Sequence, residues 1–118
     1  MQSKDLEVFD SLPFQFAVKD DEGRYVWVNQ AVLQLAQLAS KEEIIGKTDR
    51  DLIWADDADA IIKIDREVLE TGKTANVEEY AAKTAFGSVK TCSCKFAAEL
   101  DGKKCLFAVV VLMPDENN

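Results

Sequence analysis

The spacing of apolar positions divides the first quarter of the chain into one short helix and two strands. Residues 3–12 carry apolar side chains at helical intervals, and we expect that helix to end before Pro13, which restricts the residue preceding it. Residues 14–19 alternate large apolar side chains with smaller or polar ones, which predicts a half-buried strand. A tight turn at residues 20–23 then leads into a second strand at residues 24–28.

The middle of the chain has the pattern of consecutive helices. Apolar side chains recur at helical spacing over residues 31–39. Residues 40–43 have the sequence of a capping box, and residues 48–51 have the composition of a second helix cap. A longer helix follows the two acidic residues at positions 56–57, which favour a helix N-terminus, and Gly72 is its natural end.

The last third of the chain predicts three strands, at residues 77–82, 89–98 and 103–112. Residues 86–88 separate the first two strands, and the pair Asp101-Gly102, which favours a tight hairpin turn, separates the last two. Two strands, a helical segment and three strands indicate the α+β class. We therefore expect one antiparallel sheet with helices on one side.

Composition is that of a soluble single-domain protein. The 118 residues suit one domain over residues 1–118, with an N-terminal cap helix at residues 1–12 and a polar tail or truncated linker at residues 114–118. No apolar run approaches the ~18 residues of a membrane helix, and no signal peptide is recognisable, so we expect a cytoplasmic location without membrane contact. The net charge of −8 disfavours contact with phosphate, so no nucleic-acid partner is expected.

Residue types that perform catalysis or hold cofactors are scarce. The chain has no His, which removes the commonest general base and haem ligand, so haem is not expected. In the hairpin register that the Asp101-Gly102 turn predicts, Cys105 lies about 13 Å along the sheet from the partner of Cys94. One zinc ion therefore cannot bind both of these thiols together with Cys92, and we expect no metal site. With no nucleophile–base pair and no phosphate-binding loop, we expect no enzyme.

Three short segments in a fixed order resemble the PAS sensor family. The stretch Asp21–Ala31 is similar to the PAS segment in which a charged turn leads into a strand that ends on Asn. Residues 42–49 (EEIIGKTD) and residues 65–73 (DREVLETGK) are similar to two later PAS segments. Periodicity alone does not separate profilin-like, PAS and GAF domains, so the resemblance rests on these motifs and their spacing. It is a resemblance to PAS domains of the bacterial sensory-box type.

The resemblance implies a PAS fold, in which a five-stranded antiparallel sheet has the order 2-1-5-4-3 and helices enclose a ligand pocket on one face. Photoreactive members of the family carry a Cys just after the short helices, whereas residues 46–50 here contain none, so no photoreactive flavin is expected. The cofactor is left open, and a small-molecule ligand is compatible with the fold. The residues expected to have structural roles are Gly23, Asn29, Gly46, Asp49 and Gly72.

Apolar side chains of the sheet and the long helix are candidates for a pocket wall. The candidate pocket residues are Phe16, Trp27, Val28, Ile61, Ile64, Val68, Tyr80, Cys92, Cys94, Phe96, Phe107 and Val109. The last strand is apolar on both sides, so its second face needs a cover, either the N-terminal helix or a second subunit. The candidate homodimer-interface residues are Leu6, Phe9, Leu12, Leu106, Ala108, Val110 and Leu112.

We therefore expect a non-catalytic sensory input module of a bacterial signal-transduction protein. It would bind a small ligand in an apolar pocket, dimerise, or do both. It would thereby control an output domain of the same parent protein, such as the histidine kinase of a two-component system or a GGDEF-type diguanylate cyclase. A pure interaction or dimerisation module with a collapsed pocket is an alternative. A small cone-shaped α+β enzyme is a second one, and the lack of His disfavours it.

Overall fold

The computed structural model describes residues 1–113, so the expected tail at residues 114–118 lies outside the described part of the chain. Five strands form one sheet: β1 (Gln15–Lys19), β2 (Tyr25–Val28), β3 (Ala75–Ala81), β4 (Val89–Leu100) and β5 (Lys103–Leu112). The helical elements are the α-helices α1 (Gln30–Leu35) and α2 (Ala58–Thr71), and the 3-10 helices η1 (Ser3–Phe9), η2 (Lys41–Glu43), η3 (Asp49–Asp51) and η4 (Ala55–Asp57).

The sheet has the order β2-β1-β5-β4-β3, with every neighbouring pair antiparallel, which confirms the expected topology. The β4–β5 hairpin turns at Asp101 and Gly102, which both have positive φ, at 51° and 81°. Two successive residues of positive φ are typical of the tight hairpin turn that matches strand twist. This turn sets the register in which Cys94 pairs with Val109, as the sequence predicted.

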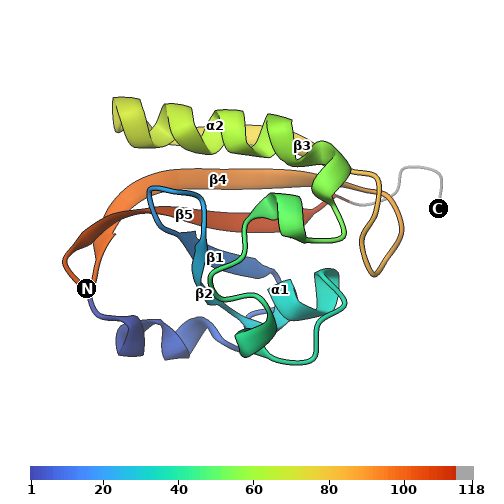
Figure 1. The fold of residues 1–118 in the computed structure, drawn as a ribbon, viewed down its shortest axis with the longest axis horizontal. Helices are drawn as coiled ribbons and strands as arrows, with labels where there is room; N and C mark the ends of the chain where they lie inside the picture. Colours follow the sequence, from blue (N-terminus) through green and yellow to red (C-terminus); the bar gives the residue numbers. More distant parts are fainter. Residues whose placement is uncertain (114–118) are drawn as a thin grey trace.

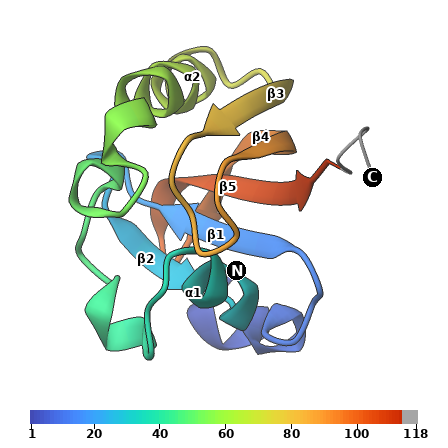
Figure 2. The ribbon, with the colours of Figure 1, turned by 90° about the vertical axis from the view of Figure 1, so that its right-hand side faces the viewer.

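The two faces of the sheet are covered unequally (Figures 1 and 2). We call the face toward α1, η3, η4 and α2 the inner face; α2 runs along β4 and β5 on this side. The opposite, outer face is covered by η1, whose Leu6 is 1% exposed. Successive strand residues point to opposite faces, so each residue of a strand is committed to one of these two layers.

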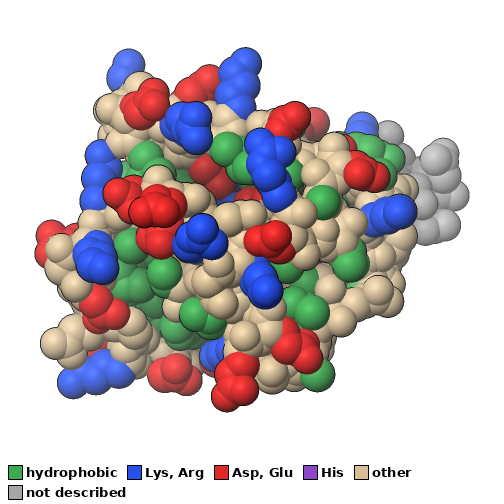
Figure 3. All heavy atoms as spheres, viewed as in Figure 1, with side chains coloured by type: hydrophobic (Ala, Val, Ile, Leu, Met, Phe, Trp, Pro, Cys, Tyr) green, Lys and Arg blue, Asp and Glu red, His purple; other side chains and the backbone are tan. Residues whose placement is uncertain are grey.

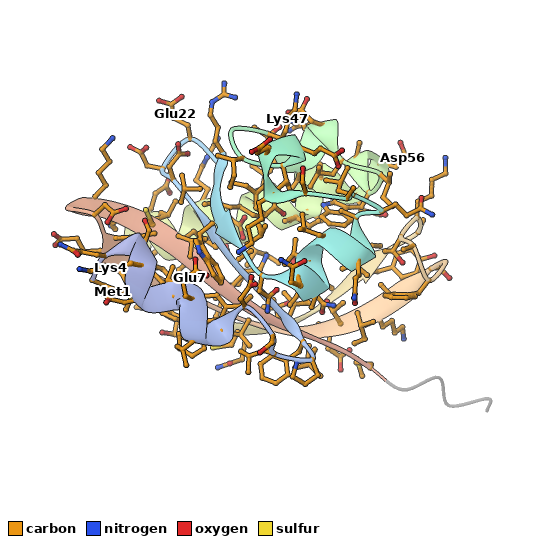
Figure 4. All side chains as sticks on the ribbon, turned by 90° about the horizontal axis from the view of Figure 1, so that it is seen from below. Met1, Lys4, Glu7, Glu22, Lys47 and Asp56 are labelled. Carbon is orange, nitrogen blue, oxygen red and sulfur yellow. The ribbon has the colours of Figure 1, made fainter. Side chains whose placement is uncertain are left out.

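Two helices are shorter than the sequence predicted. The N-terminal helix ends at Phe9 and is a 3-10 helix, and its outward side carries Lys4 and Glu7 (Figure 4). Helix α1 ends at Leu35 instead of extending to residue 39, because Gln37 adopts a left-handed backbone conformation with φ of 58°. A helix cannot continue through such a residue.

Asn29 ties three elements together at the end of β2. Its side-chain oxygen accepts hydrogen bonds from the N–H groups of Val32 (3.3 Å) and Phe16 (3.1 Å). Its side-chain NH₂ donates to the carbonyls of Phe9 (3.1 Å) and Phe14 (2.9 Å). The residue is fully buried. It therefore caps α1, as expected from sequence, and also fixes the entry of β1 and the end of η1.

The surface carries interspersed charges of both signs. On the face seen in Figure 3, acidic and basic side chains alternate over α2 and the loops below it, with apolar atoms between them. Among residues 1–113, no helix is long and apolar enough to cross a membrane.

Candidate ligand-binding site

Residues 46–49 carry the chain from the surface into the interior alongside β2. The N–H of Gly46 donates to the carbonyl of Tyr25 (2.8 Å), and the N–H of Tyr25 donates to the carbonyl of Lys47 (2.9 Å). Gly46 has a φ of 84°, which favours glycine. This pairing places Asp49, at the start of η3, where it is only 2% exposed.

Asp49 accepts three hydrogen bonds in the interior. Its Oδ1 accepts from the hydroxyl of Tyr25 (2.6 Å) and from Nε1 of Trp54 (2.9 Å), and its Oδ2 accepts from Nζ of Lys19 (2.6 Å). Burial acts to raise the pKa of Asp49, but the charge of Lys19 and these hydrogen bonds outweigh burial and lower the pKa below its usual value. Asp49 is therefore a buried carboxylate that stays ionised.

The ion pairs continue from Lys19 across the inner face to β3. Nζ of Lys19 also binds Asp65 of α2 (2.8 Å), and the other oxygen of Asp65 binds Nζ of Lys95 of β4 (2.8 Å). Lys95 in turn binds Glu79 of β3 (2.7 Å). We call Lys19, Asp49, Asp65, Glu79 and Lys95 the buried charge network. It joins β1, η3, α2, β4 and β3, with two ammonium groups and three carboxylates.

The network also shifts the proton affinity of its neighbours. Burial opposes the charged form of Lys19, but the negative charges of Tyr25 (when ionised), Asp49 and Asp65 outweigh it and raise the pKa of Lys19 well above its usual value. Burial and the adjacent Asp49 raise the pKa of Tyr25 well above its usual value. At neutral pH the site therefore holds a charged Lys19, an ionised Asp49 and a neutral Tyr25.

A cavity of about 90 Å³ lies beside the network, between the inner face and the helices. The wall of the cavity is mostly apolar. It is polar at two places: side chains of the buried charge network reach one, and polar strand residues reach the other. The lining residues are Gln15, Ala17, Lys19, Tyr25, Val32, Leu35, Asp49, Trp54, Ile61, Glu79, Tyr80, Ala81, Val89, Thr91, Ala108 and Val110. A partly enclosed, mostly apolar space with a few polar groups is typical of small-molecule sites.

Only two of the residues predicted for the pocket, Ile61 and Tyr80, line this cavity. Val28 packs beneath α1, Val68 of α2 packs on β5, and Ile64 is half-buried on α2. The pocket prediction is corrected for the remaining candidates, because the strand register places all of them on the outer face. These outer-face residues are Phe16, Trp27, Cys92, Cys94, Phe96, Phe107 and Val109.

The predicted dimer interface divides in the same way between the two faces. Leu6, Phe9 and Leu12 lie on the outer face, in the cluster that η1 forms with the sheet. The four predicted strand residues lie on the inner face instead, where Ala108 and Val110 line the cavity. The corrected strand residues are Leu106, Ala108, Val110 and Leu112.

The pocket and dimer predictions therefore exchanged the two faces of the sheet, and this exchange has a physical cause. Sequence reasoning took the face of the last hairpin that carries Cys94, Phe107 and Val109 as the inward wall of the pocket. In the structure, that apolar side packs under η1, whereas the inner side carries the network residues Lys19 and Lys95. Their charges are paired rather than solvated, so a strand position that looks exposed from sequence is buried here. All three cysteines lie on the outer face, and burial raises the pKa of the Cys105 thiol.

The predicted structural residues lie at turns and caps. Gly23 closes the β1–β2 turn with φ of 79°, and Gly72 ends α2 with φ of 71°, donating its N–H to the carbonyl of Val68. Gly46 and Asp49 belong to the segment that enters the interior, and Asn29 joins η1, β1 and α1. Sequence reasoning named Asp49 for a structural role only and left out Lys19, its partner.

Three comparisons relate the chain to known proteins. A family model described as PAS fold matches residues 9–115. A Sinorhizobium fredii protein, y4lL, is 33% identical over 72 residues, which are 61% of this chain and 9% of that protein. The structure of VqmA bound to DPO has a TM-score of 0.82 and 26% identity, over 95% of this chain and 57% of that chain.

A structure of the Vibrio cholerae VqmA dimer without its target DNA is also similar, with a TM-score of 0.82 and 25% identity. The match covers 98% of this chain and 54% of that chain, so the chain spans about half the length of these proteins. VqmA is described there as a DNA-binding receptor, which overturns the expectation of no nucleic-acid partner. The expectation rested on the net charge of −8, which describes this chain alone.

Proposed function

Because this chain belongs to the PAS fold family, we propose that it is a sensory domain that binds a small molecule in the cavity beside the buried charge network. The observation that carries the proposal is the cavity of about 90 Å³ at the inner face, bordered by β1, β4, β5, α1 and the start of α2. A partly enclosed apolar hollow of this size, with polar groups at its edge, favours a ligand over a plain core.

Binding rather than catalysis suits the chemistry of this wall. Asp49 accepts three hydrogen bonds, and Lys19 donates to two carboxylates. Both groups are therefore held in fixed contacts, whereas a general acid or base has to exchange a proton with its substrate. We propose that these residues position the ligand and the helices around it.

The buried charge network gives a route from the cavity to the surface of the domain. Lys19 lines the cavity and binds Asp65 of α2 on its other side. A ligand that displaces Lys19 changes the support of α2, so occupancy can be passed to whatever contacts that helix. The likeness to VqmA favours an output that involves DNA. That output would belong to a part of the parent protein beyond this domain, and this domain would control it.

Ligand binding is tested by isothermal titration and thermal unfolding with DPO, the molecule bound in one similar structure, and by native mass spectrometry of the purified chain. Ala108→Leu adds three carbons to the cavity wall and should abolish binding of any ligand found. Ala39→Leu, at an exposed position, is the matched control and should bind normally. Equal binding by both variants would place the ligand elsewhere.

A second candidate function, homodimerisation, is favoured by the part of the outer face that η1 leaves uncovered. Val111 is 46% exposed there, and half-buried Val109 lies two residues before it on the same face of β5. Exposed apolar patches on a sheet mark protein contacts. We propose that a second copy packs on this surface beside η1.

Dimerisation is tested by light scattering at high micromolar concentration. Val111→Lys should convert the dimer to a monomer, because the ammonium group would be buried without a partner. Ile45→Lys, at an equally exposed loop position (44%), is the control and should remain dimeric. A monomeric wild-type chain, or a dimeric Val111→Lys variant, would contradict this interface.

A further inference from the structure

We propose, building on the ligand-binding function above, that the cavity selects small ligands carrying an N–H or O–H donor, neutral or positively charged, and rejects anions. The donor is recognised by the side-chain oxygen of Gln15.

Gln15 is an unmatched polar group in the cavity wall. It lies at the start of β1, pairs with Val110 in the strand ladder, and is 6% exposed. Within residues 1–113, its buried Oε1 has no hydrogen-bond partner. Buried acceptors in native proteins are almost always paired, so an unpaired buried oxygen on a residue that lines the cavity favours a donor supplied from outside the chain.

The neighbours of Gln15 extend this polar end of the cavity. Ser93 lies on the same ladder row through Val110, and Thr91 lies two residues along β4 and lines the cavity. Their hydroxyl oxygens are 3.4 Å apart, and both residues are buried. Each hydroxyl can accept as well as donate. The end of the cavity between β1 and β4 is therefore a polar patch in an otherwise apolar wall.

The charge of the opposite end disfavours anions. Lys19 is the cation that lines the cavity, but two of its three N–H donors are bound to Asp49 and Asp65. Glu79, which also lines the cavity, adds a third carboxylate against only two ammonium groups in the network. An anionic ligand would face this excess of negative charge, with one remaining N–H of Lys19 to bind it.

The inference is tested with three five-membered rings of nearly equal size, added to the ¹⁵N-labelled chain and followed by NMR. Pyrrole offers an N–H donor, oxazole offers acceptors only, and furan offers no donor. We expect pyrrole to shift the amide signals of Gln15 and Thr91 and to bind about fivefold more tightly than furan, the ratio expected for one net hydrogen bond. Acetamide should bind, and acetate, of the same size, should not.

Gln15→Met keeps the length of the side chain but removes the acceptor, so the ratio between pyrrole and furan should fall to about one. Gln34→Met, at an exposed position of α1, is the matched control and should keep the wild-type ratio. If Gln15→Met fails to fold, the wild-type ratios decide the question alone.

The outcomes separate this inference from the function on which it rests. Equal binding of pyrrole and furan, preference for oxazole, or tight binding of acetate would overturn the donor preference while leaving a ligand cavity in place. A pyrrole preference that persists in Gln15→Met would overturn the role of Gln15. If no probe shifts any signal from the cavity wall, both the inference and the ligand-binding function fail.

Discussion

Asn29 shows how much a single buried side chain does in this domain. A helix cap is visible from the sequence, and loss of a cap alone costs about 1 kcal/mol. The structure adds three further hydrogen bonds, to Phe16, Phe9 and Phe14. These partners are 13 to 20 residues away in sequence, so no local sequence pattern predicts these hydrogen bonds. The side chain is therefore a junction between η1, β1 and α1.

We predict that Asn29→Ala lowers the free energy of unfolding by about 2–4 kcal/mol, because it leaves buried backbone groups without partners. Urea denaturation followed by circular dichroism measures the change. Asn76→Ala, at an exposed position of β3, should have little effect. A loss of only about 1 kcal/mol for Asn29→Ala would mean that the cap is the whole contribution of this residue.

At the scale of elements, the strands and their order follow from the sequence better than their faces do. The Asp101-Gly102 turn gives the register of β4 and β5 directly, and β-branched runs give the strands. The faces depend on whether Lys19 and Lys95 meet solvent or buried carboxylates. That is decided by Asp49 and Asp65, which lie 30 and 46 residues after Lys19. Periodicity reports only a side chain's own polarity, so it cannot reveal such pairs.

Mutations in η1 can show whether the N-terminal segment belongs to the folded unit. Leu6 is 1% exposed against Phe16 and Phe107, whereas Val8 on the same helix is 74% exposed. We predict that Leu6→Ala lowers the free energy of unfolding by about 2–5 kcal/mol through the cavity it creates. Val8→Ala should change it by about 0.5 kcal/mol or less, as is usual for surface positions.

Denaturant unfolding of both variants checks this prediction. A single transition shifted to lower urea in Leu6→Ala, with an unchanged slope, would show that η1 unfolds together with the sheet. Similar midpoints for Leu6→Ala and Val8→Ala would mean that η1 is only loosely attached to the outer face.

For the whole molecule, we expect Asp49, Lys19 and Tyr25 to contribute to the pH range over which the fold is stable. The folded-state pKa of Asp49 is lowered, so its contribution is present above its unfolded value of about 3.9 and is lost as pH falls through the folded value. The folded-state pKa values of Lys19 and Tyr25 are raised, so their contributions are present below about 10 and are lost as pH rises through the folded values.

We therefore predict a plateau of stability between about pH 5 and pH 9, with losses on both sides that originate in one cluster of residues. Urea midpoints measured from about pH 2.5 to pH 11 give the curve. Asp49→Asn should lower the plateau, because it removes one of the two carboxylates that pair with Lys19, and should flatten the acid side, because the titrating carboxylate is gone. Asp21→Asn, an exposed turn residue, should leave the curve unchanged. If Asp49→Asn kept the acid side as steep as in the wild type, the acid sensitivity would arise from carboxylates outside the interior.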